Sequence, residues 1–158
     1  MKDYIFINKA KALAITGHRV IPKDFNKEKL TKLLITFVNK GFDTFLVGMA
    51  LGFDTVCFNC LERIKTKNDI KIIACVPCSS QAYKFTKDQK EEYERMLSVA
   101  DEKILVSESY SATCMMKRNK YMVDNASCVL AYIKRDFGGT ANTVKYAKKI
   151  GVPVVNYD

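Results

Sequence analysis

Three glycine-bearing stretches of the chain contain residue types that bind phosphate. The first, TGHR, places Gly17 close to Arg19, the second, GMALGFD, covers residues 48–54, and the third, FGGT, covers residues 137–140. A glycine before a helix lets backbone N–H groups approach an anion, and the helix dipole favours it there. Arg19 could hold the same anion through two parallel hydrogen bonds. The structural alternative is that these glycines only permit tight turns.

Arg118 and Asn119 interrupt an apolar stripe in the segment MMKRNKYMVD, whose spacing predicts a helix. A buried arginine needs a partner. We expect that partner to be an internal carboxylate, with Asp54 or Asp124 as candidates, or an anionic ligand.

His18 is the only histidine, and without a placed partner it is a weak candidate for acid–base chemistry.

The cysteines raise the question of a zinc site, because Cys57-x-x-Cys60 and Cys75-x-x-Cys78 have the spacing of a four-cysteine centre. Cys57 and Cys60, however, lie on the apolar stripe of a helical pattern that begins at Phe53. Cys75 lies inside KIIACV, which has the character of a buried strand. We therefore interpret these thiols as reduced core residues and expect no metal site.

Composition and charge narrow the class of protein. Hydrophobic residues make up 48% and charged residues 27% of the 158 residues, which is typical of a globular protein. No apolar run approaches the roughly 18 residues of a membrane span, and the N-terminal MKDYIFINKAKALAI does not resemble a signal peptide. We expect a cytoplasmic protein. The net charge of +9 makes nucleic acid a possible but not favoured partner, since the lysines are spread over the chain.

Strand-like and helix-like segments alternate along the chain, which predicts βαβ units around a parallel sheet. The predicted strands cover 12–16, 44–48, 71–76, 103–107, 128–133 and 152–156. The predicted helices cover 27–40 with Asn26 as N-cap, a segment from Phe53, a segment after the capping box Thr86-x-x-Gln89, 113–125 and 140–150. Residues 1–158 are expected to form one three-layer α/β domain with a mainly parallel sheet of about six strands.

The polar and glycine-rich stretches follow the predicted strands, whereas the connections that follow the helices are ordinary helix stops. Ligands of such sheets bind outside the carboxyl ends of the strands. The sequence therefore places a candidate site at that edge of the sheet.

Five motifs in order resemble the YpsA-like family of the SLOG superfamily: TGHR, GMALGFD, PCSSQ, YSATCMMKRNKYMVD and GGTANTVKYAKKIGVPV. The resemblance extends over residues 12–155. It implies a Rossmann-like fold with a pocket for a nucleotide or nucleotide-derived ligand. It also implies a homodimer. We expect no cofactor. The site residues that it implies are Thr16, Gly17, His18, Arg19, Gly48, Met49, Gly52, Asp54, Pro77, Gln81, Arg118, Asn119, Gly138, Gly139 and Thr140.

The superfamily implies three functions for the chain. The first is binding or sensing of an NAD- or ADP-ribose-like ligand. The second is cleavage of a nucleotide N-glycosidic bond, as in LOG phosphoribohydrolases, and the third is single-stranded DNA binding, as in the DprA group. LOG enzymes carry GGxGTxxE, but here Gly139 and Thr140 are followed by Ala-Asn-Thr-Val without the glutamate. The sequence therefore favours binding over hydrolysis and leaves open whether the protein is an enzyme.

Overall fold

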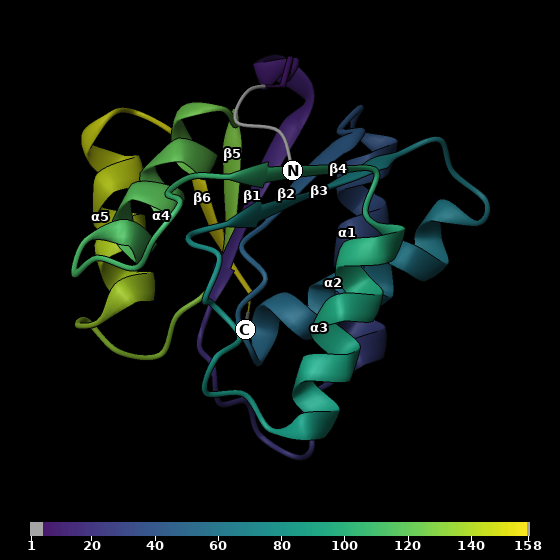
Figure 1. Cartoon of the computed structure of the whole chain (residues 1–158). Coiled ribbons are helices and arrows are strands. Elements are labelled where there is room, and N and C mark those ends of the chain that lie inside the picture. Colours follow the sequence, from purple (N-terminus) through teal and green to yellow (C-terminus); the bar gives the residue numbers. More distant parts are fainter. Residues whose placement is uncertain (1–4, 158) are drawn as a thin grey trace.

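A six-stranded parallel sheet forms the centre of the computed structural model, which describes residues 5–157 (Figure 1). The strand order is β4-β3-β2-β1-β5-β6. The strands are β1 (Ala12–Gly17), β2 (Thr44–Val47), β3 (Lys71–Val76), β4 (Glu102–Leu105), β5 (Cys128–Tyr132) and β6 (Val154–Asn156). Neighbouring strands in this order all pair in parallel. The predicted fold class is confirmed, and the sheet is parallel throughout.

Helices cover both faces of the sheet, which gives three layers (Figure 1). One face carries α1 (Lys27–Asn39), α2 (Phe53–Lys65) and α3 (Lys87–Val99), and the other carries α4 (Cys114–Asp124) and α5 (Gly139–Lys149). A short 3-10 turn, Lys9–Lys11, precedes β1. The division into two faces follows from the strand order, because right-handed crossovers that move in opposite directions along the sheet place their helices on opposite faces.

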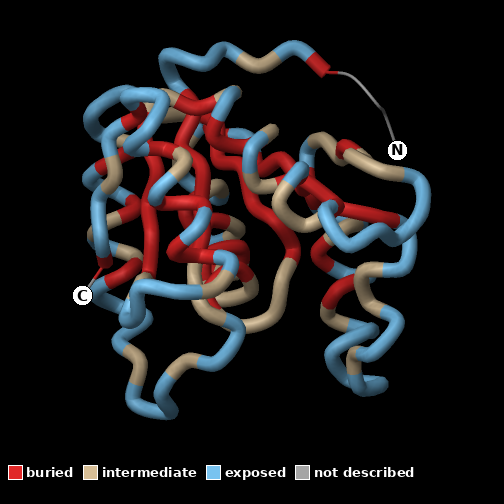
Figure 2. Tube along the Cα trace, turned by 90° about the vertical axis from the view of Figure 1, so that its left-hand side faces the viewer, coloured by how far each residue is buried: buried red, intermediate tan, exposed pale blue. Residues whose placement is uncertain are grey.

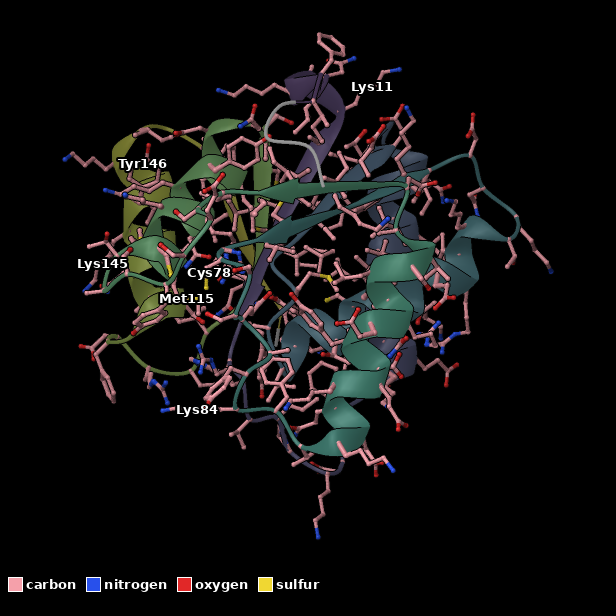
Figure 3. All side chains as sticks on the ribbon, in the orientation of Figure 1. Lys11, Cys78, Lys84, Met115, Lys145 and Tyr146 are labelled. Carbon is pink, nitrogen blue, oxygen red and sulfur yellow. The ribbon has the colours of Figure 1, made fainter. Side chains whose placement is uncertain are left out.

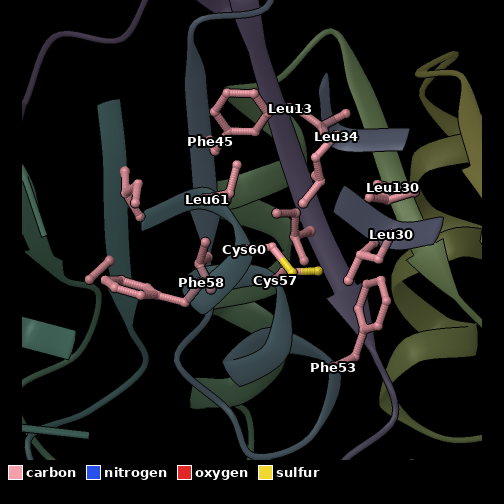
Figure 4. Packing of buried hydrophobic residues seen from close by; sticks show 14 of the residues in the cluster. Leu13, Leu30, Leu34, Phe45, Phe53, Cys57, Phe58, Cys60, Leu61 and Leu130 are labelled. Carbon is pink, nitrogen blue, oxygen red and sulfur yellow. The ribbon is translucent and has the colours of Figure 1, made fainter. Parts of the chain in front are cut away.

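Two hydrophobic clusters, one on each face, fill the space between the sheet and the helices. Leu13 and Ile15 of β1 pack in the first, while Ala12 and Ala14 pack in the second. This alternation is the period of a strand whose two faces are both covered. Figure 2 shows the buried segments running through the middle of the molecule, and Figure 4 shows side chains of the first cluster.

The cysteines lie on both sides of the sheet. Cys57 and Cys60 of α2 pack in the first cluster, and Cys75 of β3 packs in the second. The two Cys-x-x-Cys pairs therefore do not converge on one point. No group of three or more metal-ligating side chains occurs among residues 5–157. The geometry agrees with the interpretation of these thiols as apolar core residues.

Side-chain caps begin two helices where the sequence predicts them. Asn26 accepts a hydrogen bond from the Lys29 N–H at 2.9 Å. At α3, Thr86 and Gln89 form the complete capping box, with reciprocal bonds of 2.9 and 3.2 Å. These local bonds satisfy N–H groups that a helix start leaves without intrahelical partners. Because they depend on nearby residues, the sequence alone predicts where α1 and α3 begin.

The edge strand β4 ends earlier than predicted, at Leu105 instead of residue 107. The hydrogen bonding to the neighbouring chain nevertheless continues, since the Val106 N–H donates to the Val76 carbonyl and the Ser107 N–H to the Pro77 carbonyl. Both residues thus keep their backbone pairing beyond the regular strand. The apolar, β-forming sequence predicts this extended pairing but not the residue at which the regular strand ends.

Gly17 and Gly52 let the turn after β1 lie directly on the start of α2. A Cβ atom on Gly17 would lie 2.4 Å from the Phe53 ring, and one on Gly52 would lie 2.3 Å from the Arg19 carbonyl oxygen. Gly52 also has a φ of 80°, which favours glycine. The Phe53 N–H donates to the His18 carbonyl at 3.0 Å. This packing fixes the loop that carries His18 and Arg19.

The Gly52→Ala variant tests this close packing. It should lose about 2 kcal/mol or more of unfolding free energy, because the new methyl group meets backbone atoms that cannot move aside. Gly139→Ala is the matched control, since a Cβ there has no atom within 4 Å, and its effect should stay within about 0.5 kcal/mol. Chemical denaturation measures both. Equal stability of the two variants would contradict the packing at Gly52.

Candidate functional site

A pocket of about 680 Å³ opens at the carboxyl ends of β1 and β5. These strands are neighbours, with Gly17 paired to Tyr132. The chain order reverses between them, because β2, β3 and β4 lie on one side of β1, whereas β5 and β6 lie on the other side. Ligands of open α/β sheets bind at such a reversal. The pocket is lined by Ile15, Thr16, Gly17, His18, Arg19, Val20, Ile21, Pro22, Ala50, Asp54, Met115, Arg118, Asn119, Tyr132, Lys134, Arg135, Gly139 and Thr140.

Positive charge dominates the lining of this pocket. Arg19, Arg118, Lys134 and Arg135 supply cations, and Asp54 is the only carboxylate among the lining residues. The guanidinium of Arg135 lies 4.9 Å from the centre of the exposed Phe137 ring. A concave site with this balance of charge attracts anions.

The N-terminus of α5 forms one wall of the pocket through Gly139 and Thr140. Its N-cap, Gly138, has no side chain that could accept a hydrogen bond from the first turn, and the first turn holds no acidic residue. The first intrahelical bond closes at Asn142, whose N–H donates to the Gly138 carbonyl at 2.9 Å. The earlier N–H groups and the helix dipole therefore favour an anion at this end.

Arg118 lies almost completely buried beneath the pocket, with 5% of its surface exposed. It donates hydrogen bonds to the carbonyl oxygens of Gly48 and Cys75, and to the side-chain oxygen of Asn119 at 2.7 Å. Burial lowers the pKa of Arg118, while the neighbouring Asp54 carboxylate opposes that shift. Both the neutral carbonyl groups and the nearby carboxylate thus compensate this buried charge.

Asp54, and not Asp124, is the internal carboxylate near Arg118. Asp124 instead accepts a hydrogen bond from the Tyr146 hydroxyl. Asp54 is 5% exposed, and its Oδ2 accepts from the Ala50 N–H at 3.1 Å. Its Oδ1 has no hydrogen-bond partner among the described residues. Burial raises the pKa of Asp54 to about 6, against the opposing effects of Arg118, the Ala50 N–H and Arg19.

Gly48 permits the close approach of these two charged groups. A Cβ atom there would lie 2.8 Å from Nη1 of Arg118 and 3.0 Å from Oδ2 of Asp54. Its carbonyl also accepts a hydrogen bond from the Gln81 amide at 3.0 Å, in addition to the bond from Arg118. Gly48 therefore positions Arg118 and Gln81 through its carbonyl oxygen and leaves room for Asp54.

His18 connects the loops that follow β1 and β5. Its Nε2 accepts a hydrogen bond from the Lys134 N–H at 2.8 Å, and its ring meets Tyr132 edge-on at 5.8 Å between centres. Burial, and then the charge of Arg135, lower the pKa of His18. The neutral imidazole thus serves as a hydrogen-bond acceptor that holds the two loops together.

The predicted site residues fall into two groups in the structure. The pocket brings together Thr16, Gly17, His18, Arg19, Asp54, Arg118, Asn119, Gly139 and Thr140. Outside its lining are Gly48, Met49, Gly52, Pro77, Gln81 and Gly138. Within the second group, Gly48, Gly52 and Gly138 shape the backbone around the pocket, Met49 and Pro77 are buried, and Gln81 lines a neighbouring pocket.

Sequence reasoning missed Lys134 and Arg135 as individual site residues. Both follow the fifth strand directly in the stretch KRDFGGT, so their position at the carboxyl end of a strand was a usable signal. Tyr132 and Met115 were also missed. Tyr132 belongs to an apolar run that indicates only core packing, whereas Met115 shares a helix face with Arg118 and Asn119, which was a usable signal.

The fold and the site together define a Rossmann-like α/β protein with a cationic pocket at the sheet's switch point. A profile of the family YpsA, described as the YspA SLOG family, matches residues 9–151, and the chain belongs to this family. It is 37% identical over 139 residues to the uncharacterised SPbeta prophage-derived protein YoqJ of Bacillus subtilis strain 168, covering 78% of this chain and 80% of YoqJ. It is 26% identical to a UPF0398 protein of Bacillus cereus, covering 93% and 87%.

Solved structures share the fold at low sequence identity. DNA processing protein A (DprA) of Streptococcus pneumoniae superposes with a TM-score of 0.68 at 17% identity, covering 92% of this chain, which spans only 50% of that protein. DprA of Helicobacter pylori, described for its single-stranded DNA binding mode, gives 0.67 at 20% identity, with 93% and 65% covered. TM1055 gives 0.56 at 14% identity, with 91% and 72% covered.

Asp54 should make stability depend on pH. Its folded pKa of about 6 exceeds the ordinary 3.8, so the folded state holds this proton more tightly than the unfolded state. The corresponding stabilisation is complete below the ordinary pKa and is lost as the pH rises through about 6. Between pH 5 and pH 7, the wild type should therefore lose on the order of 1 kcal/mol of unfolding free energy relative to Asp54→Asn.

Denaturant titrations at both pH values measure this difference. Asp69→Asn removes an exposed carboxylate and serves as the control, for which we expect the wild-type profile. Parallel profiles for the wild type and Asp54→Asn would show that Asp54 does not titrate in this range.

Proposed function

We propose that this protein binds a nucleotide-derived small molecule, of the NAD or ADP-ribose type, in the pocket at the carboxyl ends of β1 and β5. The observation that carries the proposal is the convergence of four cationic side chains and the uncapped start of α5 on one pocket of about 680 Å³. Family membership supports the same location, because four of the five motifs of the resemblance contribute residues to the lining of this pocket.

Each part of the pocket suits a part of such a ligand. Arg19 and Arg135 are exposed and can form bidentate hydrogen bonds with phosphate oxygens, as can the N–H groups at Gly139 and Thr140. Asp54 is the only carboxylate of the lining, and its unpartnered Oδ1 is buried under the pocket surface, so it does not face a ligand directly. Ile21 and Met115 provide apolar surface for a ring. The pocket volume lies within the range of small-molecule sites.

Hydrolysis of an N-glycosidic bond is the second candidate function. Asp54 favours it, because a buried carboxyl group with a pKa of about 6 is suited to general acid or base chemistry near neutral pH. The α5 helix weighs against it. Thr143 stands where GGxGTxxE has its glutamate, and its buried hydroxyl donates to the Gly139 carbonyl at 2.8 Å. We therefore rank binding above hydrolysis.

Single-stranded DNA binding is the third possibility, and the two DprA structures show only that this chain shares their fold. The net charge of +9 is compatible with it. Binding of this kind weakens steeply with salt, so titration of an oligonucleotide at two salt concentrations distinguishes it.

The homodimer stays a prediction that light scattering would check. None of the helices within residues 5–157 has the length and apolar character needed to cross a membrane.

Isothermal titration calorimetry with ADP and ADP-ribose tests the proposed binding. Arg135→Gln and Arg19→Gln should each weaken binding by about tenfold or more, or ~1.5 kcal/mol, because each removes a charged donor to phosphate. Lys149→Gln is the control, since this lysine is exposed at the far end of α5 and should leave affinity unchanged. Failure of both ligands to bind at millimolar concentration would refute the proposal.

Chromatographic detection of free base from a panel of nucleoside monophosphates tests the hydrolytic alternative. We expect no turnover above the background of the buffer. Turnover that Asp54→Asn abolishes while nucleotide binding remains would reverse the ranking of the two functions, because this variant removes the only carboxylate of the pocket lining.

A further inference from the structure

A second pocket of about 620 Å³ adjoins the first. Arg19, Ala50 and Met115 line both pockets, so the two form one continuous concave surface across the carboxyl edge of the sheet. Figure 3 shows Met115 beside Cys78, which lines the second pocket, with Lys84 further out on the same side. The proposed binding site therefore extends beyond the part that its cations surround.

Aromatic side chains form the walls of the second pocket. Tyr83 is 77% exposed and Tyr110 68% exposed, and the half-buried Phe85 lies with them in the lining. Large side chains left this open to water are suited to stacking against a planar ring, because each offers a rigid apolar face. Lys84 adds one positive charge.

A hydrogen-bonded chain connects this second pocket to the buried arginine under the first. The Tyr93 hydroxyl donates to Oε1 of Gln81 at 2.9 Å, and the Gln81 amide donates to the Gly48 carbonyl at 3.0 Å. Arg118 donates to that same carbonyl. Phe85 packs edge-on against the Tyr93 ring at 5.7 Å between centres. The Gly48 carbonyl therefore connects the residues beneath the two pockets.

Arg19 stands at the boundary between the two pockets with its charge available. It lines both of them, is exposed, and makes no side-chain hydrogen bond or ion pair with any other residue of the described range 5–157. A free guanidinium at this point suits an anionic group that crosses from one pocket to the other.

We infer that the second pocket, walled by Tyr83, Phe85 and Tyr110, is a stacking subsite for the second ring of a dinucleotide whose bridging phosphates lie at Arg19. The inference rests on the proposed function for the first pocket and specifies its ligand class as two ring-bearing ends joined by a phosphate bridge. A mononucleotide would leave the aromatic walls uncovered.

A small dinucleotide fits these features better than a nucleic-acid strand. The lining cations concentrate in the first pocket and at the boundary, whereas the second pocket adds only Lys84 to them. A strand would need positive charge that continues along its backbone. Two adjoining hollows that share Arg19, Ala50 and Met115 match a molecule with two ends.

Calorimetry with matched probes tests the inference. ADP carries one aromatic base, whereas P1,P2-diadenosine diphosphate and NAD carry two aromatic bases joined through a diphosphate bridge. The wild type should bind the two-ringed probes at least about tenfold more tightly than ADP, or ~1.4 kcal/mol. The Tyr83→Ala/Tyr110→Ala double variant should lose this preference while its affinity for ADP stays unchanged. Phe6→Ala, which removes another highly exposed aromatic ring, should retain it.

Four results would overturn the inference. Equal affinity for ADP and the two-ringed probes would show that nothing stacks in the second pocket, and a preference that survives in the double variant would place the second ring elsewhere. Both leave the proposed function intact. An oligonucleotide that binds more tightly than any small probe and weakens in the double variant would assign the aromatic walls to a strand. Absence of binding by every probe, ADP included, would refute the proposed function together with this inference.

Discussion

The buried contact of Arg118 with the Gly48 carbonyl is the constraint around which the carboxyl edge of the sheet is organised. Arg118 comes from α4 on one face of the sheet, and the carbonyl follows β2. A guanidinium in this position requires neutral acceptors and a carboxylate close by, and it requires glycine at residue 48, because a side chain would collide with it. One buried charge thus determines several neighbours at once.

The same contact determines the chemistry available to the pocket above it. Arg118 compensates part of the cost of burying Asp54, whose pKa is nevertheless raised by burial. The carboxylate therefore opposes the surrounding cations less than an exposed aspartate would at mildly acidic pH. Arg19 and Arg135, which are exposed, are left to meet a ligand, while Arg118 stays engaged with backbone carbonyls.

Local signals made much of this structure predictable. Helix caps at Asn26 and Thr86 depend on residues three positions apart, so a short window of sequence specifies them. Loop positions after the strands could likewise be predicted from the strand pattern. Which loops share a pocket depends on strand order, and that order results from crossovers that no single segment encodes. Lys134 and Gln81 illustrate the difference, since one faces the first pocket and the other the second.

A crystal structure of the protein with bound ADP-ribose tests most directly whether the pocket at the carboxyl ends of β1 and β5 holds the phosphates of a nucleotide-derived ligand. We predict phosphate density within hydrogen-bonding distance of Arg19 or Arg135 and of the N–H groups that begin α5. Ligand density at another surface, with this pocket holding only solvent, would contradict the account.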